Sequence, residues 1–234
     1  MRRPFQFKNF SVQDTNSPMK VNTDAVLLGS WAVHPDPKTI LDIGTGCGVI
    51  ALMLAQRTYA KITAIDIDKG AIEDASQNFD NSPWASRLEA VNLDFAHYQS
   101  DHKFDLIVSN PPYFENSLKS PFSKRNLSRH NDHLNHQQLL SGCTESIKDD
   151  GIFAVILPTD VFAKFESEAL VNELFLHRIC HIRPTEHKAP NRILAEFRKS
   201  IAIQNVIDEL VLFHPNRKPT DAYKKLTSDF YPAF

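Results

Sequence analysis

The residues best suited to chemistry are 110–113, with the sequence Asn-Pro-Pro-Tyr, directly after the apolar run Phe104–Ser109. Such a run is typical of a buried parallel strand, and the prolines must lie beyond its end because proline donates no hydrogen bond to a sheet. In open α/β sheets, ligands bind beyond the carboxyl ends of the strands. The pattern therefore predicts that Asn110 and Tyr113 lie at a ligand site.

The chemistry that fits this group is nucleophilic attack by an exocyclic amine that is conjugated to a purine or a carbonyl. The lone pair of such an amine is delocalised, and two acceptors aimed at its hydrogens help it to become tetrahedral as it attacks. The side-chain oxygen of Asn110 and the carbonyl of Pro111 are the candidate acceptors. Tyr113 would stack on a planar substrate, with Phe114 extending the stacking surface. The alternative is a strand that ends in a Pro-Pro turn with a core tyrosine.

A second candidate site is the turn at 42–48, which reads Asp-Ile-Gly-Thr-Gly-Cys-Gly between a predicted strand and a predicted helix. Gly44, Gly46 and Gly48 allow a tight turn and close approach of the backbone to a ligand at the start of the helix. The spacing differs from the GxGxxG of a dinucleotide-binding turn. Asp42 suits the ammonium of a methionine-type cofactor better than a pyrophosphate.

Two further acids end the next two predicted strands. Asp66 lies 18 residues beyond Gly48 and is placed for two ribose hydroxyls, and Asp94 could accept from an adenine amine. Thr23 and Asp24 precede an apolar segment as helix caps, and a helix start facing the cleft could also touch a ligand. The alternative for each acid is a strand-end or turn residue.

The elements that must position these residues alternate between strand and helix. Strands are predicted at 39–43, 61–66, 88–93, 104–109 and 151–157, with helices at 49–57, 69–79, 135–148 and 159–175. This order predicts βαβ units, a parallel sheet and right-handed crossovers. From residue 176 onward, alternating apolar and polar residues predict antiparallel strands at the sheet edge. We expect a single domain over 1–234, with 1–34 as an N-terminal extension and helix, and residues 5–20 irregular.

Composition excludes several other classes of protein. The chain has 234 residues, 42% of them hydrophobic, and a net charge of −2. It shows no signal peptide and no membrane-spanning run, and its three cysteines are scattered, so we expect a cytoplasmic protein without structural zinc. Two basic stretches, 116–131 and 178–199, could face phosphates or could be solvated surface. The spacing of His130, His133 and His136 does not keep them on one helical face, which favours a polar or RNA-facing loop over a metal site.

Taken together, the glycine turn and residues 110–113 resemble the class I S-adenosylmethionine-dependent methyltransferases and their amino-methylating branch. Segments 19–29, 51–57, 81–85 and 221–223 narrow the resemblance to the bacterial tRNA(Val) (adenine-37-N6)-methyltransferases, over about residues 5–234. The resemblance implies an α/β, Rossmann-like fold: a seven-stranded, mostly parallel sheet with helices on both faces and antiparallel C-terminal edge strands. It also implies S-adenosyl-L-methionine as the cofactor and tRNA as the partner, with no metal and no obligate protein partner.

The same resemblance assigns roles to residues. The catalytic set is Asn110, Pro111 and Tyr113. The cofactor set is Thr23, Asp42, Gly44, Gly46, Gly48, Asp66, Ile67, Asp94 and Asn110. The substrate set is Pro112, Tyr113, Phe114, Lys124, Arg125 and Arg129. Alternative functions are methylation of another exocyclic amine (rRNA guanine N2, DNA adenine or protein glutamine N5), a nicotinamide oxidoreductase, for which no GxGxxG is evident, and a non-catalytic RNA-binding module, which would not need the cofactor acids.

Overall fold

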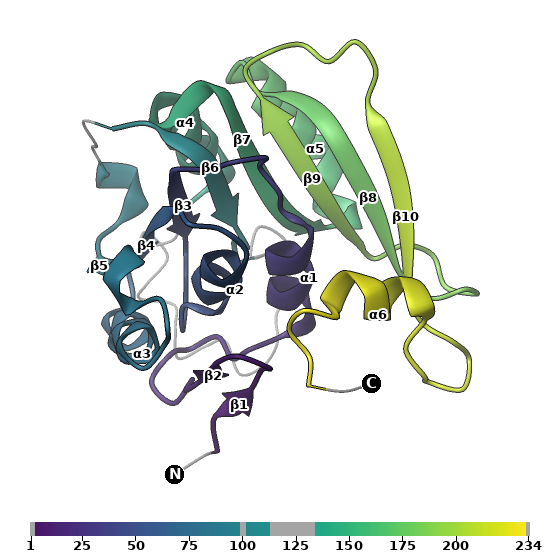
Figure 1. Ribbon diagram of the computed structural model, residues 1–234. Coiled ribbons are helices and arrows are strands. Elements are labelled where there is room, and N and C mark those ends of the chain that lie inside the picture. Colours follow the sequence, from purple (N-terminus) through teal and green to yellow (C-terminus); the bar gives the residue numbers. More distant parts are fainter. Residues whose placement is uncertain (1–2, 99–101, 113–133, 233–234) are drawn as a thin grey trace, which may run out of the picture.

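The protein is built on one twisted eight-stranded sheet, shown in the computed structural model of Figure 1. The structure describes residues 3–98, 102–112 and 134–232. The strands follow the order β10-β8-β9-β7-β6-β3-β4-β5. Their bounds are β3 Thr39–Ile43, β4 Lys61–Asp66, β5 Leu88–Asn92, β6 Phe104–Ser109, β7 Ile147–Pro158, β8 Phe175–Thr185, β9 Arg192–Arg198 and β10 Val206–Phe213.

The sheet is parallel except at one strand. β9 pairs antiparallel with both β7 and β8, whereas β10 runs parallel to β8. The predicted antiparallel pairings in the C-terminal part are therefore confirmed. The predicted count of seven was one strand short. β8 already runs in the same direction as β7, and β10 continues that direction as an eighth strand at the edge beside β8.

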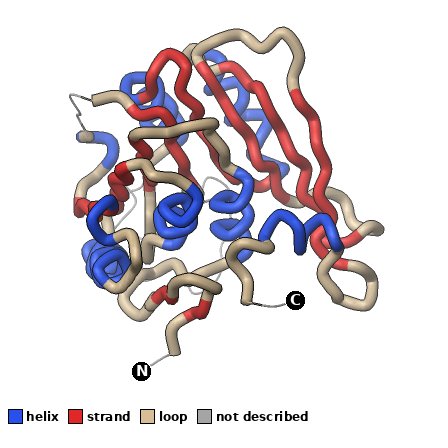
Figure 2. Tube along the Cα trace, in the orientation of Figure 1, coloured by secondary structure: helices blue, strands red, loops and turns tan. Residues whose placement is uncertain are grey.

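Helices cover both faces of the sheet (Figures 1 and 2). Their bounds are α1 Thr23–Trp31, α2 Val49–Arg57, α3 Lys69–Asp80, α4 His136–Ser146, α5 Thr159–Val171 and α6 Asp221–Thr227, with short 3₁₀ turns at Ala85–Arg87 and Phe95–His97. One hydrophobic core lies beneath α1, α2 and α3, and a second lies beneath α4 and α5. The sheet thus separates two apolar layers, as a doubly wound α/β fold requires.

Several helix starts follow the chemistry of their caps. Asp68 accepts a hydrogen bond from the Ala71 amide and caps α3, as predicted. The predicted cap of α1 was wrong: Asn22, rather than Thr23 or Asp24, accepts from the Ala25 amide at 2.9 Å. All three side chains favour a cap position. Asn22 has the extended backbone of an N-cap, whereas Thr23 and Asp24 already belong to α1.

The N-terminal segment is more ordered than predicted. Phe5–Gln6 (β1) and Ser11–Val12 (β2) form an antiparallel hairpin outside the main sheet. Phe7 and Phe10 on its turn are buried and stacked, with ring centroids 4.5 Å apart. These aromatic rings have no period along the sequence, so their burial follows from packing against distant parts of the chain.

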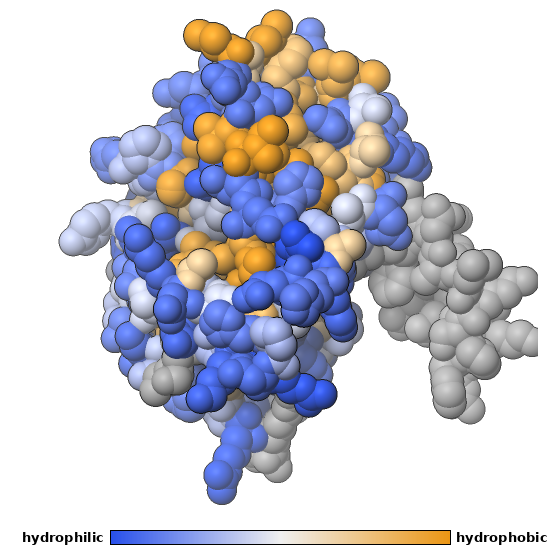
Figure 3. All heavy atoms as spheres, turned by 90° about the vertical axis from the view of Figure 1, so that its right-hand side faces the viewer, coloured by the Kyte–Doolittle hydropathy of each residue, from blue (hydrophilic) through white to orange (hydrophobic). Residues whose placement is uncertain are grey.

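The outer edge of the sheet is partly apolar. The first half of β10 and the connection before it expose aliphatic side chains: Ile201, Ile203, Val206 and Ile207. Figure 3 looks onto this side of the molecule and shows apolar atoms gathered mainly on its upper part. Within the described residues, no helix has the length and apolar character needed to cross a membrane.

Candidate active site

β6 and β3 are paired up to their last residues, at the carboxyl edge of the sheet. Ile43 and Ser109 are register partners, and the Ser109 hydroxyl donates to the Ile43 carbonyl at 3.0 Å. The residues that follow them, Gly44 and Asn110, therefore leave the sheet side by side. Asn110 is half-buried at this point.

Of the two prolines that follow, Pro111 is buried and Pro112 is exposed. The buried ring fixes φ and removes a donor at the place where the chain leaves the sheet. The Pro111 carbonyl is held by this rigid segment, directly after Asn110. The two predicted acceptors thus lie on adjacent residues at the carboxyl edge.

The glycine turn is held against β4. The amides of Gly44 and Thr45 both donate to the Ile65 carbonyl, at 2.9 and 3.0 Å. Gly44, Gly46 and Gly48 all have positive φ, which side chains rarely adopt. A Cβ on Gly48 would lie 2.5 Å from Phe79, so this glycine serves helix packing. A Cβ on Gly44 would meet nothing within 4 Å, so the backbone there borders open space.

Asp66 lies beside this turn and holds its middle. One carboxylate oxygen accepts from the Gly46 amide at 2.8 Å and the other accepts from the Asp68 amide at 2.9 Å. Burial raises the pKa of Asp66 above its usual value, although these amides act in the opposite direction. Ile67, the next residue, is 51% exposed and presents an apolar side chain to solvent. A carboxylate and an apolar surface therefore adjoin the glycine turn.

Asp42 lies beneath the glycine turn and is completely buried. Its Oδ2 accepts from the Thr45 hydroxyl at 2.6 Å, and its Oδ1 has no hydrogen-bond partner within the described residues. Burial raises the pKa of Asp42 to about 7. An orphaned buried oxygen is unusual in folded proteins. This oxygen is therefore suited to accept a hydrogen bond from the ammonium group of a ligand, either directly or through a bridging water.

Asp94 and Thr23 lie farther out along the same edge. Asp94 caps the 3₁₀ turn Phe95–His97 by accepting from the Ala96 amide at 3.0 Å. Thr23 is exposed at the first position of α1 and lines a small hollow with the ends of β8, β9 and β10. The structure thus gives Asp94 a capping role and places Thr23 toward the β8–β10 side of the sheet.

The remaining predicted residues lie outside the described ranges. They are Tyr113, Phe114, Lys124, Arg125, Arg129, His130 and His133. His136, the first residue of α4, is buried and packs edge-on against Phe165 with ring centroids 5.0 Å apart. Among the described residues, no group of three potential metal ligands is found.

The sequence reasoning missed a segment that borders the glycine turn. The amides of Asn16 and Ser17 both donate to the buried carboxylate of Asp74 on α3, at 2.8 and 2.7 Å. Asn78, one turn along the helix, donates to the carbonyls of Gln13 and Cys47, both at 2.8 Å. Residues 13–17 are thereby held beside the turn. Two polar residues four positions apart on the apolar face of a helix are the signal that could have revealed this.

The second basic stretch is engaged within the protein. Arg178 stacks on Trp31 at 3.8 Å and pairs with Glu196 at 2.7 Å, and Arg192 pairs with Asp24 at 2.8 Å. Arg183 and Lys199 also have acidic neighbours. Four cations of the stretch thus have acidic partners in the protein, and the prediction that the stretch faces phosphates stays a prediction.

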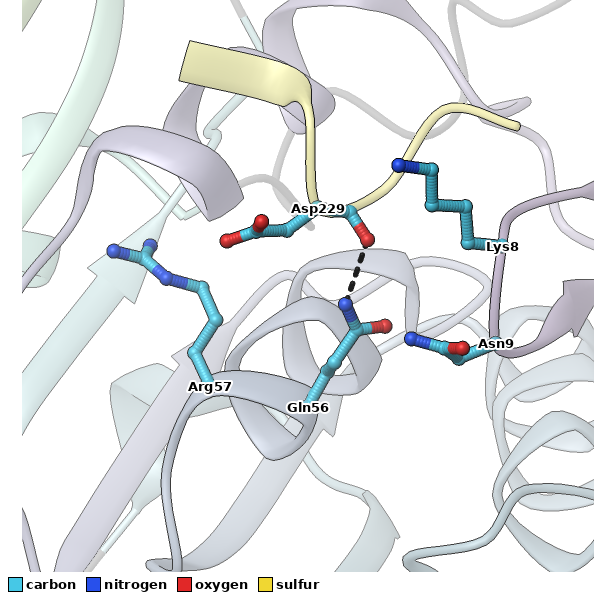
Figure 4. A pocket seen from close by; sticks show the side chains of 5 residues that line it. All are labelled: Lys8, Asn9, Gln56, Arg57 and Asp229. Atoms are coloured by element: carbon cyan, nitrogen blue, oxygen red, sulfur yellow. Dashed lines mark hydrogen bonds between the residues drawn. The ribbon is translucent and has the colours of Figure 1, made fainter. Parts of the chain in front are cut away.

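One hollow in the described part of the chain lies away from the candidate site. Its volume is about 580 Å³, and its lining is polar throughout: Lys8, Asn9, Gln56, Arg57 and Asp229 (Figure 4). Gln56 and Arg57 end α2, which begins at the carboxyl edge after β3 and runs back along the sheet. This hollow therefore lies at the C-terminal end of α2, between the N-terminal hairpin and the C-terminal tail, where Gln56 donates to the Asp229 carbonyl at 2.8 Å.

Comparison with known proteins agrees with this architecture. The family model "Methyltransferase small domain" matches residues 17–156. A tRNA1(Val) (adenine(37)-N6)-methyltransferase from Bacteroides thetaiotaomicron is 42% identical over 97% of this chain and 96% of its own length. The protein of the same name from Vibrio campbellii is 38% identical over 97% and 95%.

Solved structures show the same fold at low identity. A predicted O-methyltransferase from Agrobacterium tumefaciens superposes with a TM-score of 0.69 and 17% identity, covering 91% of this chain and 98% of that one. A putative class I S-adenosylmethionine-dependent methyltransferase from Listeria monocytogenes gives 0.60 and 14%, covering 87% and 65%. The fold, the glycine turn with its two acids, and relatives aligned over nearly the whole chain converge on one conclusion: the chain belongs to the tRNA1(Val) (adenine(37)-N6)-methyltransferase family of S-adenosylmethionine-dependent enzymes.

Proposed function

We propose that this protein methylates the exocyclic N6 amine of adenine 37 in the anticodon loop of tRNA(Val). The observation that carries the proposal is the pairing of Ile43 with Ser109, which sets Asn110 and Pro111 beside the glycine turn. Relatives that bear the name of this activity align with nearly the whole chain. A tRNA substrate implies that the enzyme acts in the cytoplasm.

The residues present fit S-adenosylmethionine as the cofactor. The open space beside Gly44 admits close approach of a ligand to the backbone, and the Asp66 carboxylate suits ribose hydroxyls. Ile67 offers an apolar surface to an adenine ring, and Asp94 offers an acceptor to its amine. The orphaned oxygen of Asp42 suits the ammonium, directly or through a water. When bound, the cofactor supplies an electrophilic methyl group.

The protein's own contribution to the reaction is to position and polarise the adenine amine. The side-chain oxygen of Asn110 and the carbonyl of Pro111 accept the two amine hydrogens. They thereby stabilise the positive charge that develops on nitrogen. Pro111 and Pro112 hold these acceptors rigidly. The methylated ammonium then loses a proton to water, so the proposal requires no general base and no metal.

Recognition of the base involves residues beyond the described part of the chain. We propose that Tyr113 stacks on the adenine, with Phe114 beside it, and that Lys124, Arg125 and Arg129 contact phosphates. A base in an anticodon loop is already unpaired, so moving it into the site costs less free energy than in a duplex.

The test is methyl transfer from labelled S-adenosylmethionine to an unmodified tRNA(Val) transcript, followed by nucleoside mass spectrometry and mapping of the product. N6-methyladenosine at position 37 is the expected product. A tRNA(Val) transcript with guanine at position 37 is the matched control and should remain unlabelled. Methylation of guanine N2, of DNA adenine or of a protein glutamine instead would reject this substrate while keeping the amino-methylating chemistry.

A further inference from the structure

A second hollow lies on the same edge of the sheet as Asn110. It is about 170 Å³ in volume and is formed by the start of α1 and the ends of β8, β9 and β10. Arg192, at its margin, is the register partner of Pro158 on β7, and β7 pairs with β6. Neighbouring strands are about 4.8 Å apart, so this hollow begins about 10 Å along the edge from the end of β6. We call it the β9 pocket.

The lining of the β9 pocket combines apolar and polar side chains. Its walls are apolar, from Leu27, Ile182, Pro184, Leu212 and Phe213, and its margin is polar, from Thr23, Asp24, Asn191 and Arg192. Apolar walls with a few polar groups at the margin are typical of ligand sites. The volume is small for such a site, and it matches a single planar ring system better than a whole nucleotide or a peptide.

The polar margin is held in place before any ligand binds. The Arg192 Nε donates to Asp24 at 2.8 Å, and the Arg192 Nη1 donates to the Asn191 carbonyl at 2.9 Å. These contacts fix a guanidinium plane at the margin, with 29% of the side chain exposed. A fixed guanidinium can stack on a base or bind its acceptor atoms.

Two turns beside the pocket carry positive charge. Lys188 lies in the connection from β8 to β9, and Arg217 and Lys218 lie in the connection from β10 to α6, all of them exposed. Both turns are visible at the lower right of Figure 1. They are joined by His214 and Glu186, whose Nδ1 and Oε1 atoms are 3.3 Å apart. Arg183 steadies the first turn by donating to the carbonyls of Lys188 and Glu186.

We propose that the β9 pocket binds one unpaired nucleobase that flanks the methylated adenine, while Lys188, Arg217 and Lys218 bind the phosphates of that strand. This inference rests on the proposed function, because it assumes a single-stranded RNA segment at Asn110. It goes beyond that function by assigning a second base-binding site. The pocket would fix the register of the anticodon loop and thereby select which adenine reaches Asn110.

The first test blocks the pocket without disturbing the core. Asn191 is exposed and lines the pocket, so Asn191→Phe should place a ring across it. We expect the KM for a tRNA(Val) transcript to rise about tenfold, as for loss of one stacked base, with unchanged affinity for S-adenosylmethionine. Asn205→Phe, the same change at an exposed position before β10, is the matched control and should leave the KM unchanged.

The second test identifies the base. Each nucleotide that flanks adenine 37 is replaced in turn by an abasic residue. At one position, removal of the base should raise the KM of the wild-type enzyme about tenfold. The same removal should raise the KM of the Asn191→Phe enzyme little further, because both changes remove the same contact. Full additivity at every position would overturn the proposal.

A third test addresses the charged turns. Lys188→Glu with Lys218→Glu should weaken tRNA binding and reduce its dependence on salt concentration, whereas Lys61→Glu with Lys103→Glu should not. Lys61 and Lys103 are exposed at the amino ends of β4 and β6, which is the opposite edge of the sheet. Equal effects of the two pairs would show that net charge alone matters and would contradict the assignment of these turns.

Photo-crosslinking of the wild-type enzyme needs no variant and covers the case in which a variant fails to fold. A tRNA(Val) transcript carrying 5-iodouracil at each flanking position should crosslink to residues 182–192 or 212–218 from one position. Crosslinks that all fall elsewhere would reject the pocket. These outcomes are distinct from failure of the proposed function, in which the wild-type enzyme would transfer no methyl group to tRNA.

Discussion

Asn110 is the residue on which the proposed chemistry most directly depends. Its position is fixed by the pairing of β6 with β3, while its side chain stays half-buried at the edge. We expect Asn110→Ala to lower kcat by about 10² to 10³, the usual loss when one preorganised hydrogen bond to the transition state is removed. Steady-state kinetics with a tRNA(Val) transcript measures this.

The matched control for Asn110 is Asn81→Ala, at the exposed C-terminal cap of α3. It should retain wild-type kcat. If Asn110→Ala retains activity within a few-fold of wild type, the two-acceptor mechanism is wrong, and the Pro111 carbonyl alone or another group must polarise the amine.

Asp42 gives a prediction about pH and stability. Its pKa is raised by burial to about 7, so between pH 4 and 7 the folded protein keeps a proton that the unfolded chain loses. This group therefore reduces stability as pH rises through that window. The free energy of unfolding of Asp42→Asn, relative to that of the wild type, should therefore rise by up to about 1.4 kcal/mol per pH unit between pH 4 and 7. Above pH 7 this difference should not increase further. Denaturant unfolding of the cofactor-free proteins measures the difference.

Cofactor binding should show the opposite dependence on pH. If the Asp42 carboxylate binds the ammonium of S-adenosylmethionine, the wild-type affinity should weaken as the pH falls below about 7, and Asp42→Asn should lose this dependence. Calorimetric titration at several pH values measures it. A wild-type affinity that does not change with pH would mean that Asp42 serves only to shape the turn through Thr45.

At the scale of single residues, the sequence predicted the positions of the site better than their contacts. Asp42, Asp66 and Asn110 were expected at strand ends, because a strand followed by a glycine or proline turn is a local pattern. The burial of Asp42 and the contact of Ser17 with Asp74 depend on segments that are distant in the sequence. No local pattern carries that information.

At the scale of elements, the glycine turn both packs against α3 through Gly48 and leaves open space for a ligand at Gly44. Substitutions at the two positions can separate these roles. Gly48→Ala would force a Cβ to within 2.5 Å of Phe79 in addition to the cost of positive φ, so we expect a loss of about 2 to 4 kcal/mol in the free energy of unfolding. Gly44→Ala meets no neighbouring atom and should lose only about 1 to 2 kcal/mol. Denaturant unfolding of the two variants should show this order.

The cofactor affinities of these variants should follow the opposite order. A methyl group at Gly44 enters the open space beside the turn and should weaken binding of S-adenosylmethionine more than Gly48→Ala does in the folded protein. Calorimetric titration well below the unfolding temperature separates the two effects. A larger affinity loss for Gly48→Ala would place the cofactor on the helix side of the turn.

Helices and strands that are determined by a local sequence pattern were predicted, whereas those that depend on distant packing were not. The bounds of β3, α2, β4 and β6 agree with prediction, because buried parallel strands are short apolar runs bounded by turn residues. The hairpin of β1 and β2 was not predicted, since its buried rings follow no period. The parallel direction of β10 was also missed, because strand direction depends on the path of the connection from β9 to β10 across the molecule.

At the scale of the whole molecule, the N-terminal hairpin and the C-terminal tail contact each other and pack into the same hydrophobic core. The Lys8 amide donates to the Phe230 carbonyl at 2.8 Å, and Phe7 stacks on Tyr231 with centroids 6.2 Å apart. Phe230 is 1% exposed and belongs to the same apolar layer as α1 and α2. The hollow of Figure 4 lies at this junction, where polar side chains link the hairpin, α2 and the tail.

Because the tail packs into this core, truncation of a buried residue in the tail should destabilise the whole protein. Phe230→Ala should cost about 3 to 5 kcal/mol, as for other buried aromatic residues, and lower the Tm by roughly 6 to 20 °C. Phe5→Ala removes a ring that is 39% exposed and should cost much less. Circular dichroism and cofactor binding should fall in one transition in both variants, because α1 and α2 share their core with the tail. Loss of the tail in a separate, earlier transition that leaves cofactor binding intact would show that the terminal segments are an accessory layer and not part of the cooperative fold.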